Sequence, residues 1–143
     1  MLFRSVAADS ATFGLPEARV GRMPLDGGMT LLQRQVPFHL AMGVLLTGKR
    51  ISAAEALRIG LVNEVMPRAE LDAAVQRWID EVLACAPLSV RAIKQVVRRT
   101  AQLSAAEARG QLLPALAEAL QSEDAQEGVR AFIEKRKPAW KGK

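Results

Sequence analysis

Few side chains in this sequence are of the types that commonly do chemistry. Glu17 follows Pro16, and Asp26 precedes a pair of glycines, so both carboxylates stand in or beside turns. Taken alone, Glu17 reads as an exposed turn carboxylate and Asp26 as a support for the glycine turn. Either becomes a candidate proton carrier or ligand only if an apolar pocket surrounds it.

The sequence has one histidine and one cysteine, so it cannot build a multi-histidine or cysteine metal cluster. His39 lies in an apolar helical run, which favours a structural histidine with satisfied hydrogen bonds. Cys85 is expected to pack as a small hydrophobic side chain. We therefore predict that the protein holds no metal.

Basic residues gather near the C-terminus, where Lys135, Arg136, Lys137 and Lys141 lie close in sequence. The net charge of +5 and the pI near 10 raise the question of nucleic acid. The chain has no tyrosine and few other aromatic residues to stack on bases, and many basic residues alternate with acidic ones. We predict no nucleic-acid partner. A smaller anionic ligand, or simply a solvated helix end, explains the basic residues better.

The bulk properties are those of one ordinary soluble protein with a core. The chain has 143 residues, half of them hydrophobic and 24% charged. Its longest apolar stretch, residues 38–46, is too short to cross a bilayer, and the first residues lack the pattern of a secretory signal. A single cysteine excludes an intrachain disulfide. A cytoplasmic protein with no membrane partner is expected.

The elements that must position these residues differ along the chain. Glycine and proline interrupt the first third, whereas apolar residues recur at helical spacing from about residue 70. Short strands are expected at 11–13 and 18–20, around a turn at 14–17, and at 61–65. Helices are expected after Gly28, over 38–46 with an end at Gly48, and from Ser52 to a stop at Gly60.

Two segments have the spacing of a capping box, in which a serine and a glutamate three residues later satisfy each other's backbone amides. They are Ser52 with Glu55 and Ser104 with Glu107. Apolar stripes should be buried on the later helices: Leu71, Val75, Trp78, Ile79 and Val82 on one, Val90, Ile93, Val96 and Val97 on the next, and Leu112, Leu113, Leu116 and Leu120 on a third.

Prolines and charges indicate where the later helices begin and end. Pro87 is placed to open one helix and Pro114 to kink another. The last helix should begin with acidic residues and carry Lys135 and Arg136 in its last turn, which would complement the helix dipole.

Several motifs in collinear order resemble the enoyl-CoA hydratase/isomerase, or crotonase, family. The residues that carry the resemblance are FGLPEARVG at 13–21, MPLDGG at 23–28, LTGKRISAAEA at 46–56, GLVNEV at 60–65, EG at 127–128 and AFIEKRKP at 131–138. The resemblance implies a mainly α chain with a few short strands. Residues 1–66 would be the tail end of the crotonase α/β spiral core, and 67–143 a C-terminal helical oligomerisation region.

The resemblance also implies an activity on acyl-CoA thioesters, with coenzyme A as part of the substrate and no other cofactor. Glu17 matches the second of the family's two glutamates, which carries a proton to or from the substrate carbon. Leu25-Asp26 departs from the Gly-Ala often found at this turn in hydratases, so Asp26 is either an extra acid near the acyl chain or a support for the glycine turn. Lys135 and Lys137 would lie near the CoA phosphates. The family precedent implies a homo-oligomer, a trimer or a hexamer.

These 143 residues lack the family's Gly-Gly-Gly-x-Glu-Leu segment and the amides of its oxyanion hole. We therefore expect a C-terminal fragment of an acyl-CoA hydratase or isomerase that is inactive alone. The alternative is a non-catalytic helical self-association module of the same origin. The acyl substrate, and the choice among hydratase, isomerase and hydrolase, depend on the missing segment.

Overall fold

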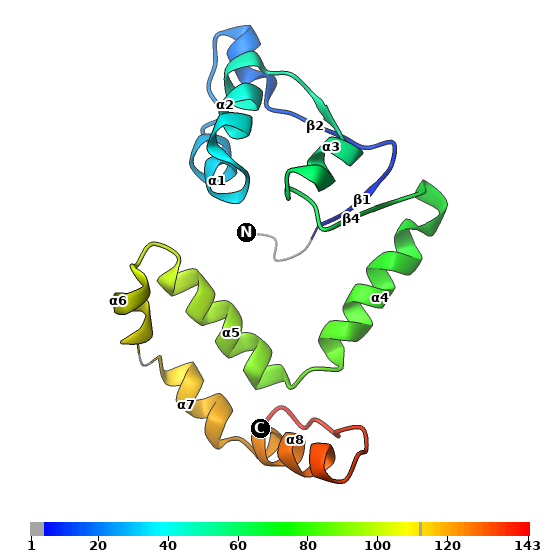
Figure 1. Cartoon of the computed structure of the whole chain (residues 1–143), viewed down its shortest axis with the longest axis vertical. Coiled ribbons are helices and arrows are strands. Elements are labelled where there is room, and N and C mark those ends of the chain that lie inside the picture. The colour runs from blue at the N-terminus through cyan, green and yellow to red at the C-terminus, as the bar shows by residue number, and fades with distance from the viewer. Residues whose placement is uncertain (1–4, 112) are drawn as a thin grey trace. The chain divides into compact units, whose positions relative to one another are not determined.

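The computed structural model describes residues 5–111 and 113–143. The chain divides into two compact units, Met1–Gln76 and Arg77–Lys143, which are described separately below (Figure 1). The division expected at residue 66 concerns the roles of the two parts and stays a prediction. Among the described residues, no helix combines the length and apolar character needed to cross a bilayer.

The first unit contains two small sheets joined by short helices. Strand β1 (Val6–Ala8) pairs in parallel with β4 (Glu64–Met66), and β2 (Thr12–Phe13) pairs antiparallel with β3 (Ile51–Ser52). The expected strand at 11–13 is thus present, and the one at 61–65 begins three residues later. The helical elements are the 3-10 helices η1 (Pro16–Val20) and η2 (Arg68–Glu70) and the helices α1 (Gly28–Gln35), α2 (Phe38–Thr47) and α3 (Ala53–Arg58).

The strand expected at 18–20 was wrong, because these residues form part of η1. Pro16 is the first residue of this 3-10 helix, where its fixed φ suits a helical turn and its missing N–H costs no hydrogen bond. Gly21 ends the element in the left-handed conformation, with φ of 69°. The Pro-Glu pair therefore stands at the start of a tight helical turn.

Small side chains form the core of the first unit. Ala41, Ala53 and Ala56 are fully buried, and the small residues of α3 let it pack closely against β2, β3 and β4. Val44 and Ile59 are also among the buried residues that make up this core.

The capping box expected at Ser52 forms only in part. The Ser52 hydroxyl accepts from the Glu55 amide at 3.2 Å. The Glu55 carboxylate instead binds Arg58, at 2.9 Å from its Nε and 2.6 Å from its Nη2. This hydrogen bond lowers the pKa of Glu55. At Ser104 the complete box is present and begins α6 (Ala105–Arg109), as predicted.

The second unit consists of helices and the C-terminal segment. Its core is formed by Leu88, Ala92 and Ala119, where α5 packs against α7. The helices are α5 (Pro87–Thr100), α6, α7 (Pro114–Gln121) and α8 (Glu123–Ile133), and α4 (Leu71–Leu83) crosses the boundary between the units. Pro87 begins α5 as predicted.

Two of the expected buried stripes were partly wrong. On α5, Ile93 and Val97 are about 60% exposed, because Leu88 and Ala92 face the partner helix instead. On α4, Val75 and Ile79 are exposed and Ala74 is the buried residue. Periodicity identifies an apolar face, but it does not tell which edge of that face meets another element.

The third stripe is divided between two elements. Pro114 begins a new helix, α7, where a kink in one continuous helix was expected. Leu113 precedes that helix and is buried, whereas Leu120 is 77% exposed. Leu112 lies outside the described residues.

The last helix ends earlier than expected. Glu134 is its C-cap residue, and Lys135 follows with a φ of 53°. Lys135 and Arg136 therefore lie beyond the helix, and the expected last turn was wrong. The left-handed residue reverses the chain direction so that residues 134–143 run back along α8.

Buried and half-buried carboxylates hold this C-terminal segment on α8. Asp124 is 1% exposed and accepts from the amides of Lys141 and Gly142, at 2.7 and 2.8 Å. Glu127 receives Arg136 through two nitrogens and the Ala139 amide at 2.9 Å. We call residues 134–143 the tail, and these contacts fix it over the N-terminal half of the helix.

Candidate active site

The turn that carries Glu17 is closed by its own backbone. The Glu17 carbonyl accepts from the Arg22 amide at 2.9 Å, and the Gly21 amide faces the Ala18 carbonyl at 3.4 Å. No residue of η1 is buried. The glutamate is thus held on a short turn at the surface of the first unit.

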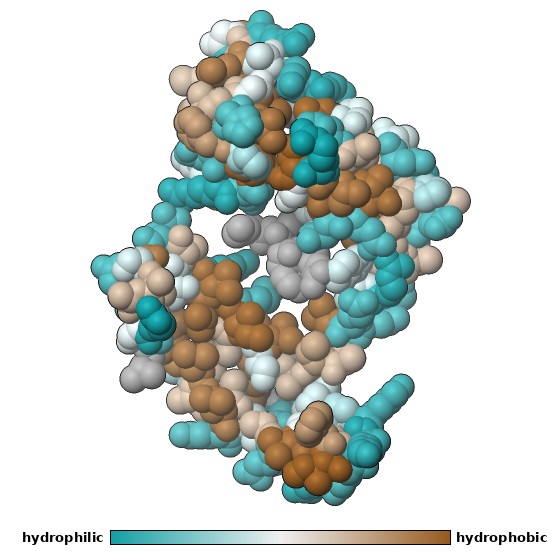
Figure 2. Space-filling model, in the orientation of Figure 1, coloured by the Kyte–Doolittle hydropathy of each residue, from teal (hydrophilic) through white to brown (hydrophobic). Residues whose placement is uncertain are grey.

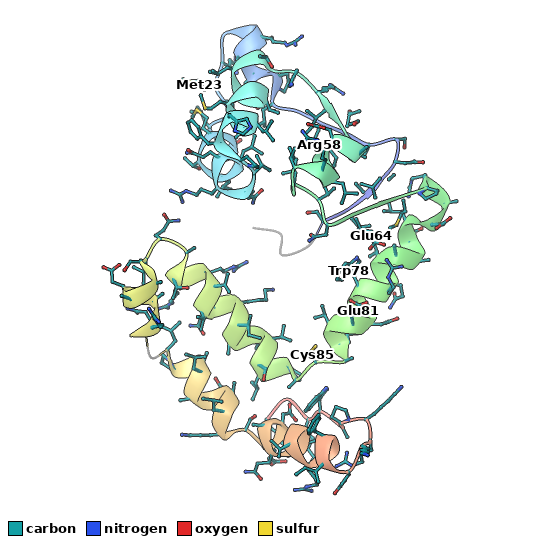
Figure 3. All side chains as sticks on the ribbon, in the orientation of Figure 1. Met23, Arg58, Glu64, Trp78, Glu81 and Cys85 are labelled. Atoms are coloured by element: carbon teal, nitrogen blue, oxygen red, sulfur yellow. The ribbon has the colours of Figure 1, made fainter. Side chains whose placement is uncertain are left out.

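The structure brings Glu17 and Asp26 to one open hollow of about 610 Å3. The rest of the lining is largely apolar or glycine, with Arg22 as its cation, and includes Leu15, Met23, Pro24 and Leu25. Figure 3 labels Met23 on the turn between η1 and α1, beside the ribbons of the first unit. Glu17 and Asp26, which belong to two different sequence segments, therefore share one small surface recess.

Glu17 carries the unsatisfied atom of this recess. Its Oε2 is buried and has no hydrogen-bond partner among the described residues. A buried acceptor without a partner costs free energy, so such an atom calls for a donor from outside the chain. A ligand hydroxyl or a water would satisfy it.

Asp26 is exposed and also borders a larger open hollow of about 910 Å3. The turn after it needs both of its glycines. Gly27 has a φ of 93°, and a Cβ on Gly28 would stand 2.7 Å from that of Pro24. This close turn places Asp26 at the border of both hollows.

The basic residues predicted near the C-terminus differ in whether they form ion pairs. Arg136 pairs with Glu127 and Glu134, and Lys141 Nζ lies 3.0 Å from Glu123. Arg136 lowers the pKa of Glu127 to about 2. Lys135 and Lys137 are exposed residues of the second unit, and neither lines the hollow that holds Glu17.

Two sequence predictions about single residues were wrong. His39 is exposed at the second position of α2, where it was expected as a structural histidine with satisfied hydrogen bonds. Cys85 is exposed at the junction of α4 and α5, and its thiol faces the Glu81 carbonyl at 3.4 Å (Figure 3). Among the described residues, no group of acidic, histidine or cysteine side chains could hold a metal ion.

Sequence reasoning missed the tail contacts and the contact of Arg19 with α2. Arg19 Nε donates to the Thr47 carbonyl at 2.7 Å. Nothing in the sequence around Arg19 or Thr47 predicts this hydrogen bond. It depends on two segments of the chain meeting in space.

The chain as a whole matches a known family. The sequence profile of enoyl-CoA hydratase/isomerase matches residues 4–143. The chain belongs to this family. Its relatives include the carnitinyl-CoA dehydratases of Proteus mirabilis, 40% identical, and of Salmonella typhi, 39% identical. Each match covers 96% of this chain and 54% of the relative, so the chain spans about half the length of these relatives.

Solved structures share the fold. An enoyl-CoA hydratase from Bacillus anthracis matches with a TM-score of 0.94 and 31% identity, over 99% of this chain and 55% of the other. One from Mycobacterium tuberculosis H37Rv matches with a TM-score of 0.91 and 32% identity, over 96% of this chain and 55% of the other. The crotonase resemblance predicted from separate motifs is thus confirmed at the level of family and fold.

Proposed function

We propose that these residues are the C-terminal part of an enoyl-CoA hydratase/isomerase subunit in which Glu17 carries a proton to or from the acyl carbon. The observation that supports this role most directly is the buried, unpartnered Oε2 of Glu17 at an apolar recess. A carboxylate oxygen without a hydrogen-bond partner remains available to a substrate proton. Glu17 would act as the positioned acid or base.

Asp26 is proposed to contact the acyl part of the substrate. It shares the recess with Glu17 and stands on a turn that two glycines fix. An exposed carboxylate among apolar neighbours would favour an acyl group with a hydrogen-bond donor or a positive charge over a plain hydrocarbon chain. The names of the carnitinyl-CoA dehydratases agree with such an acyl group.

Coenzyme A is proposed as part of the substrate, with no further cofactor. Among the tail cations, Lys135 and Lys137 have no ion pair described, whereas Arg136 and Lys141 are engaged by glutamates. Lys135 and Lys137 are therefore the better candidates to meet a CoA phosphate.

We further propose that residues 1–143 alone do not catalyse the reaction. The resemblance assigns the first of the family's two glutamates and two oxyanion amides to a segment that these residues do not contain. One oxyanion donor typically contributes about 3 kcal/mol to transition-state stabilisation. The loss of two oxyanion donors and one proton carrier removes more transition-state stabilisation than Glu17 alone can supply.

The proposal is tested with a hybrid subunit. The front half of a related hydratase is joined to residues 5–143, and loss of the enoyl thioester absorbance is followed with crotonyl-CoA. The hybrid should turn over, the 143-residue chain should not, and Glu17→Gln in the hybrid should lower kcat much more than it raises KM. Asp72→Asn, an exposed carboxylate on α4, is the control. Normal turnover by the Glu17→Gln hybrid would remove Glu17 from the mechanism.

A second candidate function is self-association without catalysis. Large apolar side chains are exposed on the last helix of the second unit, among them Val129, Phe132 and Ile133, at 63%, 85% and 73%. Figure 2 shows an apolar patch over α8. Such a surface favours burial between copies of the chain, and a trimer or a dimer of trimers is the arrangement we propose. Light scattering on a size-exclusion column distinguishes these states from a 15.5 kDa monomer.

A further inference from the structure

The C-terminal end of α2 is bound by a residue of the turn that carries Glu17. Arg19 Nε donates to the Thr47 carbonyl at 2.7 Å, and Thr47 is the last residue of the helix. Carbonyls in the last turn of a helix lack intrahelical partners, and the helix dipole favours a cation there. The Thr47 hydroxyl is engaged elsewhere, since it donates to the Gly43 carbonyl. Arg19 thus satisfies an acceptor that the helix leaves open.

The same end of α2 also meets the start of η1. Gly48 follows Thr47 with a φ of 58°, and a Cβ at that position would stand 3.0 Å from Arg19 Cγ and 3.1 Å from Pro16 Cα. Gly48 therefore lies close to Pro16 before Glu17 and to Arg19 after it. Glycine is required there for its conformation and for this close approach.

We infer that Arg19 is the positioning residue for Glu17. No residue of η1 is buried, so apolar packing contributes little to its placement. The backbone hydrogen bonds within the turn close it but do not attach it to a helix. The hydrogen bond from Arg19 to Thr47 makes that attachment to α2. The inference rests on the proposed role of Glu17 as a proton carrier, because that role needs a carboxyl held in one place.

The test measures how often this turn opens, by amide hydrogen exchange on the 143-residue chain without substrate. The reporter is the Arg22 amide, which donates to the Glu17 carbonyl, and the reference is the Ile59 amide in the core of the same unit. Arg19→Met keeps the aliphatic contact with Gly48 and removes the donor. Arg19→Lys keeps a donor and the charge, and Arg68→Met removes a cation from η2 as the matched control.

Loss of a hydrogen bond from a charged donor should speed exchange of the Arg22 amide about tenfold in Arg19→Met. Arg19→Lys should restore at least half of the protection on a logarithmic scale, and Arg68→Met should leave it unchanged. Ile59 should keep its protection in all variants.

Three results would overturn the inference: unchanged exchange at Arg22 in Arg19→Met, equal acceleration in the lysine variant, or an equal loss at Ile59 that marks general unfolding. Because no turnover is measured, these results do not depend on whether Glu17 is catalytic. A failure of the proposed chemistry would show only in the Glu17→Gln hybrid.

Discussion

Replacing Asp124 by alanine should release the tail from α8. Asp124 is almost fully buried and accepts from two tail amides, those of Lys141 and Gly142. Hydrogen bonds to a charged acceptor contribute about 1.5 kcal/mol each at the low end, so the variant should weaken tail docking by about 3 kcal/mol. That free energy corresponds to roughly a hundredfold increase in the population of the open tail.

The assay is amide hydrogen exchange at residues 141 and 142, followed with the indole N–H of Trp140. That indole donates to the Ala84 carbonyl at 2.7 Å, so it reports whether the tail still reaches the junction of α4 and α5. Both amides and the indole should exchange faster in Asp124→Ala, while the amide of Ala92, inside α5 and in the core, keeps its protection. Glu118→Ala, an exposed acid on α7, serves as the control. Unchanged protection at 141 and 142 would show that the carboxylate does not hold the tail.

Three further outcomes are expected. The hydrogen bond from Arg136 lowers the pKa of Glu127 to about 2. The stability that Glu127 contributes is therefore complete above about pH 4.5 and disappears as the pH falls through about 2. Acid titration should expose Trp140, and Glu127→Gln should abolish that pH dependence. Ser104→Ala removes the serine of a complete capping box, so exchange of the Glu107 amide should rise about fivefold, whereas Ser104→Asp should retain protection. Phe132→Asp should dissociate an oligomer on a light-scattering column if α8 is the contact, and an unchanged mass would exclude that surface.

Local rules predicted the elements whose ends are marked by a single residue. Gly48 ends α2 and Pro87 begins α5, because a left-handed conformation and a missing N–H act within one turn. Pro114 shows the limit of such rules. A proline can kink a helix or begin one. Here Leu113 is extended, as a residue before a proline prefers, and Pro114 begins α7.

Contacts between distant segments could not be predicted from a single sequence. Periodicity showed that α5 has an apolar face, yet Ala92 rather than Ile93 meets α7. At the candidate site, the motif identified Glu17 and Asp26, and the structure places both at one recess. The tie from Arg19 to Thr47 joins residues 28 positions apart, so it follows from the fold and from no local pattern.

The parallel pairing of β1 with β4 has a consequence for how the chain is made. Ser5 and Asn63, which bond at the start of this pair, are 58 positions apart, and the residues between them build η1, α1, α2 and α3 from local contacts. A connection of that length is slow to close, so we expect the strand pair to form after those helices. During translation, β1 would leave the ribosome with an unpaired edge and keep it until residues 64–66 emerge. That interval is when the nascent chain is most exposed to pairing with another strand.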